Sequence, residues 1–409
     1  MAIINGEILL TNGTIATVPA FGANLDAFGR QRTSETGQRF DVEFLYDLQP
    51  DIFSAHVGGA GTIAHNAATR DVTLSNNGVT TDDRARLVQR WHNPYTPGNG
   101  QLIDVTGTLD GAGLETGTAG IFLRNAGTDT IVTQNNWNGA ATTDVDWNKA
   151  QIFAFDFQSL KVGRLRYYLV RDGVPVVVHE IPNDNRLTNG YWQLANAPIQ
   201  WAIRNTDTET IIEFGYFDEQ NGLGFRYAMP ANADAEAIAI CATVKSEGGA
   251  ALNDIPGIER AFDTGVAGIT VSTTEIPLLS FRPKLEVNSL PNRGLVFPVA
   301  LLAYGTGNDA IVRIRKNATL TGATFAGNLG AAALTEYDTA ATAVTGGDVI
   351  STVMIPASNQ SPGIVSQSVR VPLSVNYLGD SADTITISAV RFATGDASVW
   401  AGAVVKELK

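Results

Sequence analysis

Residues 164–180 contain the feature that most constrains the fold: two strand-like segments joined by a two-residue turn. In the first segment Leu165, Tyr167 and Leu169 occupy every second position, with an arginine and a second tyrosine between them. This period of two is what a half-buried strand requires. Asp172-Gly173 then supplies the two positive-φ positions of a tight hairpin turn. The segment is therefore predicted to form an antiparallel hairpin.

The same pattern recurs along most of the chain. Apolar runs at 199–203 and 210–217 are typical of strands, and Asn221-Gly222 marks the next turn. Near the C-terminus, residues 311–315 and 384–387 again alternate between apolar and polar side chains. The 41 glycines suit many short strands joined by tight turns. The fold is predicted to be all-β, with two antiparallel β-sandwich or jelly-roll domains and an extended N-terminal arm.

Changes in local composition suggest the domain boundaries. Residues 1–40 are rich in polar turns and lack helical periodicity, so they are assigned to the N-terminal arm. Strand patterns then run from 41 to 250, which predicts a first β-sandwich domain. A stretch of small residues and turn formers introduces residues 251–274, the expected linker. Residues 275–409 are predicted to form a second β-sandwich domain.

The charge balance excludes several classes of partner. The chain has 28 basic and 41 acidic residues, giving a net charge of −13. Such a surface repels phosphate backbones and anionic bilayers, so neither nucleic-acid binding nor membrane insertion is expected. The N-terminus lacks the basic and apolar regions of a signal peptide, and no apolar run approaches the roughly 20 residues of a membrane helix. Cys241, the single cysteine, is expected to be a small buried apolar residue.

Carboxylates are the first candidates for catalysis, because glycoside hydrolysis is the enzyme class that a β-sandwich most readily suggests. That reaction needs two carboxyl groups about 5–9 Å apart across a groove. Glu213, Asp218 and Glu219 lack the spacing that places such groups on one strand, and residues 218–222 are typical of a solvated turn. Asp156 is the only carboxylate of its predicted strand. The sequence therefore predicts that the protein is not an enzyme.

Histidines and known motifs add no chemistry. His179 and Glu180 are adjacent on a predicted strand, so their side chains point to opposite faces and cannot cooperate directly. His179 is expected to make a hydrogen bond in a core or an interface. The chain lacks a phosphate-binding loop, a nucleophile elbow, a calcium loop and paired-histidine metal spacing. No cofactor and no metal are predicted.

Tryptophans are the remaining candidates for binding. Trp137 and Trp147 flank a polar, turn-rich stretch, which makes them candidate residues for stacking on a glycan. Packing in a core or an interface is the alternative, because large rings dominate both. The same two alternatives, glycan stacking and packing, apply to six further rings: Trp91, Trp192, Trp201, Trp400, Tyr95 and Tyr191.

Segments spread over nearly the whole chain carry a resemblance to a known family. The opening segment is Asn24-Leu-Asp-Ala-Phe-Gly-Arg-Gln-Arg-Thr-Ser34, and the later segments are 40–41, 45–47, 89–98, 106–107, 152–158, 162–166, 172–173, 179–180, 198–199, 203–205, 214–218, 221–222, 278–282, 336–339 and 346–347. In order and spacing they resemble a widespread family of virion structural proteins of tailed bacteriophages. The chain departs from the family pattern at 124–129 and 321–345.

The resemblance implies a non-enzymatic virion component built from β-sandwiches and assembled in the host cytoplasm. The expected place is the tail, baseplate or a fibre, and the expected partners are further copies of the chain, with a trimer favoured, and other virion proteins. Alternatives are a capsid decoration or head-fibre protein, a module that binds a host surface glycan, and a polysaccharide depolymerase. Arg30, Arg32 and Arg39 are candidate interface residues whose guanidinium groups can pair with a neighbour's carboxylates. Salt bridges within the chain are the alternative for these arginines.

Overall fold

β-Strands make up nearly all of the regular structure in the described part of the chain. Regular helix is limited there to two short 3₁₀ turns, Leu114–Thr116 and Gln134–Asn136. The strand pairings whose register is defined among the described residues are antiparallel. The predicted all-β class is confirmed. The computed structural model describes residues 36–78, 80–111, 114–140, 145–248, 257–356, 372–392 and 395–409, with three short strands within residues 3–17.

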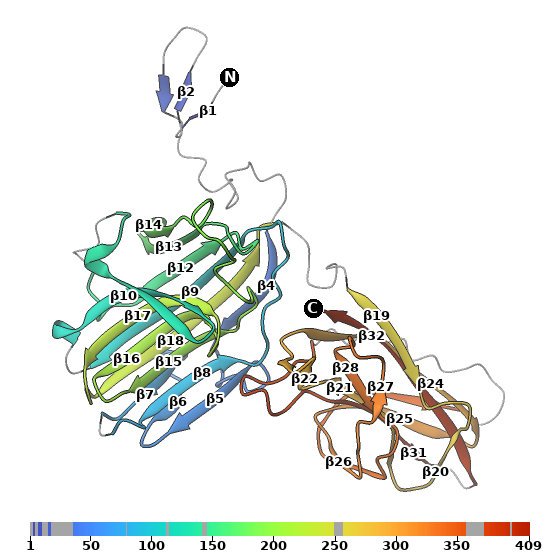
Figure 1. The fold of residues 1–409 in the computed structure, drawn as a ribbon. Coiled ribbons are helices and arrows are strands. Elements are labelled where there is room, and N and C mark those ends of the chain that lie inside the picture. Colours follow the sequence, from blue (N-terminus) through green and yellow to red (C-terminus); the bar gives the residue numbers. More distant parts are fainter. Residues whose placement is uncertain are drawn as a thin grey trace. The chain divides into compact units, whose positions relative to one another are not determined.

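The chain divides into two compact units, and apart from Gln89–Pro94 Figure 1 shows the first in blue to yellow and the second in yellow to red. The first comprises Met1–Val88 and Tyr95–Ile255, and the second comprises Gln89–Pro94 and Pro256–Lys409. The strands near the N-terminus, which pair with one another, are β1 (Ile3–Ile4), β2 (Glu7–Leu9) and β3 (Ile15–Thr17).

The first unit consists of two large sheets. The seven-stranded sheet has the order β11 (Thr128–Thr133), β10 (Thr118–Asn125), β17 (Gly222–Pro230), β16 (Glu209–Phe217), β15 (Ile199–Asn205), β8 (Arg84–Gln89) and β5 (Phe53–Gly58). The eight-stranded sheet has the order β14 (Val174–Ile181), β13 (Leu165–Arg171), β12 (Gln151–Phe157), β9 (Gln101–Gly111), β18 (Ala235–Ser246), β7 (Asp71–Ser75) and β6 (Thr62–Asn66), with β4 (Gly37–Glu43) also paired to β18.

Aromatic side chains join these two sheets into a sandwich. Phe153 of β12 contacts Phe214 of β16 and Phe225 of β17, with ring centroids 5.5 and 4.8 Å apart. Tyr167 of β13 contacts the same Phe225 at 6.1 Å. Gly107 of β9 lies against the Phe214 ring, where a Cβ atom would come within 2.7 Å of the ring. The strands alternate because every second side chain enters this aromatic layer.

The hairpin predicted from residues 164–180 is confirmed. Strands β13 and β14 pair from Leu165–Ile181 to Arg171–Val174, and Asp172 and Gly173 between them have φ values of 52° and 76°. Leu165, Tyr167 and Leu169 are fully buried, as the alternation predicts.

The second unit is also a β-sandwich. Its first sheet contains β19 (Ile258–Asp263), β20 (Ile269–Val271) and β24 (Leu295–Gly307), all paired with the long C-terminal strand β32 (Ala397–Leu408). Its second sheet has the order β27 (Gly327–Asn328), β28 (Thr335–Asp338), β21 (Ile276–Pro283), β31 (Ile385–Arg391), β25 (Ala310–Lys316) and β30 (Asp348–Ile355). Two small hairpin pairs are β22 (Glu286–Val287) with β23 (Leu290–Pro291) and β26 (Thr319–Thr321) with β29 (Ala343–Thr345).

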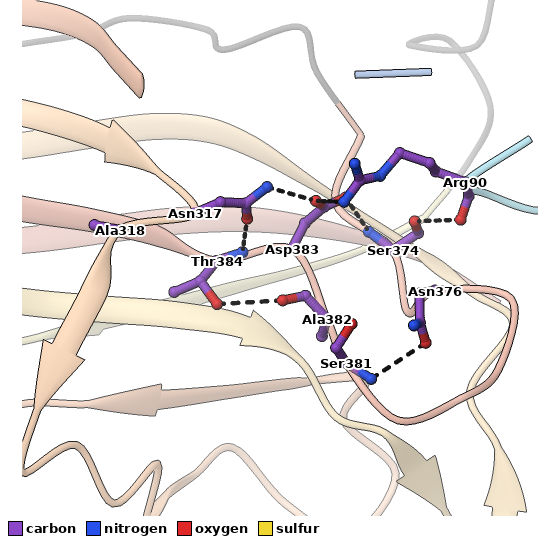
Figure 2. A pocket seen from close by; sticks show the side chains of 9 residues that line it. All are labelled: Arg90, Asn317, Ala318, Ser374, Asn376, Ser381, Ala382, Asp383 and Thr384. Carbon is purple, nitrogen blue, oxygen red and sulfur yellow. Dashed lines mark hydrogen bonds and ion pairs between the residues drawn. The ribbon is translucent and has the colours of Figure 1, made fainter. Parts of the chain in front are cut away.

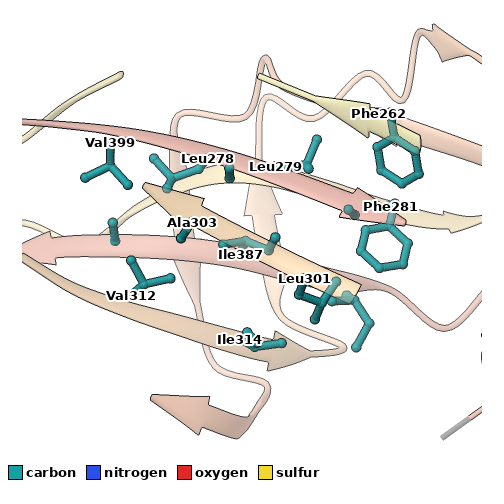
Figure 3. Close-up of a cluster of buried hydrophobic side chains, with 14 of the residues drawn as sticks. Phe262, Leu278, Leu279, Phe281, Leu301, Ala303, Val312, Ile314, Ile387 and Val399 are labelled. Atoms are coloured by element: carbon teal, nitrogen blue, oxygen red, sulfur yellow. The ribbon is translucent and has the colours of Figure 1, made fainter. Parts of the chain in front are cut away.

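An aliphatic core holds the two sheets of the second unit together (Figure 3). Leu301 and Val399 come from the first sheet, and Val312 and Ile387 come from the second. All four are at most 2% exposed. The predicted alternation of residues 311–315 is confirmed, because Val312 and Ile314 point into this core while Arg313 and Arg315 bind Glu275 on the opposite side of the strand.

Some expected boundaries differ from the structure. Residues 258–263 and 269–271, assigned to the linker 251–274, form β19 and β20 and pair with β32. Their own sequence carries little alternation, and the pairing comes from the long strand β32 beside them. Strand β4 begins at Gly37, within the expected arm. Residues 18–35 of that arm lie outside the described residues. The segment Gln89–Pro94 belongs to the second unit although the sequence assigns it to the first domain.

Candidate functional site

The candidate interface arginines fall into two groups. Arg30 and Arg32 lie outside the described residues. Arg39 lies in β4, is 6% exposed, and donates from Nη2 to the Thr96 hydroxyl at 3.5 Å. Arg39 is therefore buried within the single chain, next to a hydroxyl group of the same unit. Its role at a subunit interface stays a prediction.

Trp137 is half-buried in the first unit. Its indole Nε1 donates to the Val132 carbonyl at 3.1 Å, and its ring meets the edge of Phe225 at 5.8 Å. Since Phe225 belongs to the aromatic layer, the ring of Trp137 extends the core toward the surface.

Trp147 is half-buried as well. Its ring stacks almost parallel on Phe153, with centroids 6.4 Å apart and planes 6° apart, and it contacts Tyr227 at 5.8 Å. Phe153 and Phe225 touch each other, so Trp137 and Trp147 cover the same aromatic pair from two different loops. Both tryptophans thus have the packing role that was the alternative to glycan stacking. Glycan stacking on them stays a prediction.

Three of the four candidate carboxylates are bound by arginines. The Glu213 side chain, 3% exposed, accepts a hydrogen bond from Arg124 Nη2 at 3.2 Å and lies 3.8 Å from Arg204 Nη2. Glu219 forms an ion pair with Arg86. Both carboxylates therefore have a cationic partner within the chain.

Asp218 and Asp156 have structural partners. The Asp218 carboxylate accepts the backbone N–H groups of Gln220 and Asn221, both at 2.7 Å, and so closes the turn that the sequence predicts. Asp156 accepts from Arg166 Nε at 2.8 Å and from the Tyr168 hydroxyl at 2.7 Å. Burial and the Asp156 charge raise the pKa of Tyr168 well above its ordinary value.

Glu275 is a carboxylate of the second unit that accepts hydrogen bonds from three side chains. Its two oxygens accept from Arg315 Nε and Nη2 at 2.7 and 2.9 Å, and they also bind Arg313 and the Ser388 hydroxyl. Partial burial raises its pKa, but hydrogen bonds from Arg315, Ser388 and Arg313 outweigh burial and lower the pKa from 4.5 to about 2. The sequence analysis missed Glu275, although the outward-facing Arg313 and Arg315 indicated that an anion was needed beside them.

His179 has the role expected for a core histidine. It is 7% exposed, its Nδ1 accepts the Asn138 backbone N–H at 3.2 Å, and burial lowers its pKa. Glu180 points to the other face of the sheet, where it lies 3.7 Å from Arg164. The two adjacent side chains thus have different partners, Asn138 and Arg164.

Cys241 differs from expectation. A β-bulge between Ala239 and Cys241 shifts the alternation of β18 by one residue, so Cys241 faces outward and is only half-buried. There it lines a shallow groove of about 580 Å³ over β4, β9 and β18, with the carboxylates of Asp41, Glu43 and Asp104. In the described part of the chain, no group of three or more His, Cys, Asp or Glu side chains is placed to hold a metal ion.

A polar pocket of about 280 Å³ lies within the second unit (Figure 2). Three segments far apart in the sequence form it: Gln89–Pro94, which contributes Arg90, the residues that follow β25 at Asn317, and the loop 374–384. The full set of lining residues is Arg90, Asn317, Ala318, Ser374, Asn376, Ser381, Ala382, Asp383 and Thr384. Sequence reasoning missed this pocket because only the fold brings these segments together.

Asp383 is the centre of the pocket wall. Its side chain is 6% exposed and accepts from the Asn317 amide at 3.0 Å and from the Ser374 backbone N–H at 3.4 Å. The cationic groups of Arg90 and Lys316 lie 3.9 Å from the same carboxylate. The pocket therefore carries a buried anion flanked by two cations and surrounded by neutral hydrogen-bonding groups, as Figure 2 shows for the lining residues.

Local hydrogen bonds fix the shape of this wall. The Asn317 backbone N–H donates to the Thr384 carbonyl at 2.8 Å, and the Thr384 N–H returns a bond to the Asn317 side chain at 2.9 Å. The Asn376 side chain accepts the Ser381 backbone N–H at 3.2 Å, and the Ser374 hydroxyl donates to the Arg90 carbonyl at 3.2 Å. The polar groups are thus arranged before any ligand arrives.

No helix in the described part of the chain is long and apolar enough to cross a membrane.

No protein-family model and no curated protein matches the sequence. Among solved structures, one from work on endo-acting O-glycanases of the human gut microbiota that initiate mucin breakdown is 11% identical, with a TM-score of 0.29, and the match covers 51% of this chain and 98% of that chain. The Bacillus licheniformis β-glucanase is 12% identical, with a TM-score of 0.19 and coverage of 52% and 99%. The Ca²⁺- and mannose-bound exoplasmic/lumenal domain of VIP36 is 5% identical, with a TM-score of 0.19 and coverage of 51% and 91%. The likeness concerns the β-sandwich fold alone, and with TM-scores this low it carries nothing about what this chain binds or does.

Proposed function

We propose that this protein is a non-enzymatic structural component of a tailed-bacteriophage particle, located in the tail or baseplate region. Segments that resemble the virion family run from residue 24 to residue 347. The two antiparallel sandwich units are the architecture that this resemblance implies. Assembly as a homo-oligomer, with a trimer favoured, is part of the proposal, because identical subunits of a particle usually close with rotational symmetry.

One observation supports the non-enzymatic part of this proposal: arginines bind three carboxylates that lie in strands or beside them. Asp156, Glu213 and Glu275 each bind at least one guanidinium group. A sandwich glycosidase needs a carboxyl group that keeps its proton near neutral pH. The pKa of Glu275, about 2, is displaced in the opposite direction. These pairs instead tie separate segments of the fold together, as a rigid particle component requires.

Cryo-electron microscopy of intact particles tests the structural role. We expect density for both sandwich units in a ring or fibre at the tail. Density on the capsid lattice would replace the tail assignment by a capsid decoration or head-fibre role. Absence of the chain from purified particles, checked by mass spectrometry of the same sample, would overturn the structural role.

A reducing-end assay tests the non-enzymatic part separately. The purified chain is incubated with polysaccharide from the host surface, and new reducing ends are counted. We expect none above the buffer background. Release that disappears in the variants Glu213→Gln or Asp156→Asn would show that one of these carboxylates is catalytic after all.

A further inference from the structure

We infer that the polar pocket of the second unit binds a single neutral sugar residue. The pocket is a cavity of about 280 Å³ whose wall includes Arg90, Ser381 and Asp383. This volume lies at the lower end of the range for small-molecule sites, so the occupant is smaller than a typical cofactor. The inference goes beyond the structural role and does not depend on it, because binding is a property of the chain wherever the chain is located.

The chemistry of the wall selects a ligand rich in hydroxyl groups. Of the nine lining residues, only Ala318 and Ala382 have apolar side chains, and none is aromatic. An apolar ligand would cover the remaining polar groups without replacing their bonds to water, at a cost for each group. Arg90 offers only donors, Asp383 only acceptors, and Ser381 offers both. A sugar ring matches this mixture, since every hydroxyl donates one bond and accepts others.

The pocket wall carries charges of both signs. Arg90 is on the wall, and its Nη2 lies 3.9 Å from the Asp383 carboxylate, which Lys316 Nζ, a group not on the wall, approaches at the same distance. Although two cations flank it, the Asp383 carboxylate on the wall would repel a phosphate or sulfate that approached Arg90. A neutral ligand avoids that repulsion and uses the Arg90 donors together with the Asp383 acceptors. Inorganic phosphate therefore serves as the competing probe in the test below.

The pocket is arranged in advance, which lowers the entropy that binding costs. The mutual hydrogen bonds of Asn317 and Thr384 hold one side, and the turn from Asn376 to Ser381 holds the other. The Ser381 hydroxyl has no hydrogen bond to any described residue, and Ser381 is exposed. For one sugar with few apolar contacts we expect a dissociation constant of about 1 mM. Several copies in one particle would strengthen attachment to a surface by multivalency.

The test is a ligand-observed NMR titration of the full chain with D-glucose, D-galactose, D-mannose and N-acetyl-D-glucosamine, each measured alone and with inorganic phosphate. We expect saturable binding of at least one of the four sugars, undisturbed by phosphate. Ser381→Ala removes one hydroxyl and should weaken binding by about fivefold. Ala318→Leu fills part of the cavity and should abolish binding.

Arg391→Gln is the matched control for Arg90→Gln. Arg391 lies at the far end of β31 from Thr384 and pairs with Asp396, whereas Arg90 is on the pocket wall. We expect loss of binding with Arg90→Gln and wild-type binding with Arg391→Gln. Three results would overturn the inference: no sugar saturates, phosphate displaces the sugar, or Ser381→Ala and Ala318→Leu both bind as the wild type does. None of these results bears on the presence of the chain in particles.

Discussion

At the scale of single residues, the main feature is the pairing of arginine side chains with carboxylates. Arg124 is an example: its Nε and Nη2 donate to the two oxygens of Asp129 at 2.7 and 2.8 Å, and Nη2 also reaches Glu213. Burial lowers the pKa of Arg124, but the bonds and charges of Asp129 and Glu213 outweigh it and raise the pKa above its ordinary value. Such forked pairs combine charge with fixed geometry, so a residue on one strand sets the position of a residue on another.

Glu275 gives the prediction at this scale. Because its pKa falls from 4.5 in an ordinary environment to about 2 in the fold, the unfolded chain binds a proton more readily than the folded chain does. The stabilisation by Glu275 is therefore complete above pH 4.5 and is lost as the pH falls toward 2. Glu275→Gln should lower the free energy of unfolding at pH 7 by about 2 kcal/mol. In this variant the free energy of unfolding should also fall less between pH 4.5 and pH 2 than it does in the wild type.

The measurement is urea unfolding of wild type and variant across that pH range. Glu336→Gln is the matched control, since Glu336 pairs with the single residue Arg282 at 2.7 Å and both side chains are partly exposed. Glu336→Gln should lower the free energy of unfolding by less, about 0.5 kcal/mol. Equal acid sensitivity in wild type and Glu275→Gln would contradict the assignment of this proton linkage to Glu275.

At the scale of elements, small residues and bulges decide how strands meet. In β9, Gly107 leaves room for the Phe214 ring of the facing sheet. In β18, the bulge before Cys241 reverses which face the next side chains occupy, so Ala242 and Val244 are buried. In β31, Thr386 is fully buried although it alternates with isoleucines, because its hydroxyl pairs with that of Ser280 at 3.0 Å. Alternation therefore predicts strands more reliably than it predicts which face is exposed.

Gly107→Ala is the prediction for this scale. The new Cβ atom would lie 2.7 Å from Phe214 Cε2 and 2.9 Å from the Ile238 carbonyl oxygen, so the two sheets would have to separate. Overpacking of this kind should cost about 2 kcal/mol of unfolding free energy. Gly173→Ala is the control: no atom lies within 4 Å of the new Cβ, and only the positive φ of 76° opposes it, at about 1 kcal/mol. Denaturant unfolding checks both, and a neutral Gly107→Ala would show that the sheets yield easily at this position.

At the scale of the whole molecule, the chain builds two separate hydrophobic cores. The first unit relies on aromatic rings such as Phe153, Phe214 and Phe225. The second relies mainly on aliphatic side chains such as Leu279 and Ile387. Units with their own cores are expected to unfold as separate cooperative transitions.

Differential scanning calorimetry of the full chain tests this independence. We expect two transitions. Leu87→Ala in the first unit and Leu279→Ala in the second each remove a fully buried side chain. Each should destabilise only its own transition, by about 3 kcal/mol. If both variants shift a single common transition, the two cores are energetically coupled.

The sequence by itself determined the local structure. The alternation at 165–169, the turn at Asp172-Gly173 and the outward arginines 313 and 315 all depend on neighbours a few residues away, and the structure contains each as predicted. Backbone stereochemistry and the period of two are local properties, so a single sequence carries them. The same holds for the all-β class, which sums many such local preferences.

Only the tertiary structure decided which distant residues meet. Strands β19 and β20 exist because β32 offers a pairing edge more than 120 residues later, as the pairs Ile258–Glu407 and Ile269–Val399 show. Arg90 and Asp383 line one pocket although more than half of the chain lies between them in the sequence. No local pattern encodes such encounters, because they follow from closing long loops around a shared core. The sequence therefore determined what each segment becomes, and the packing of distant strands determined where the residues of the pocket lie.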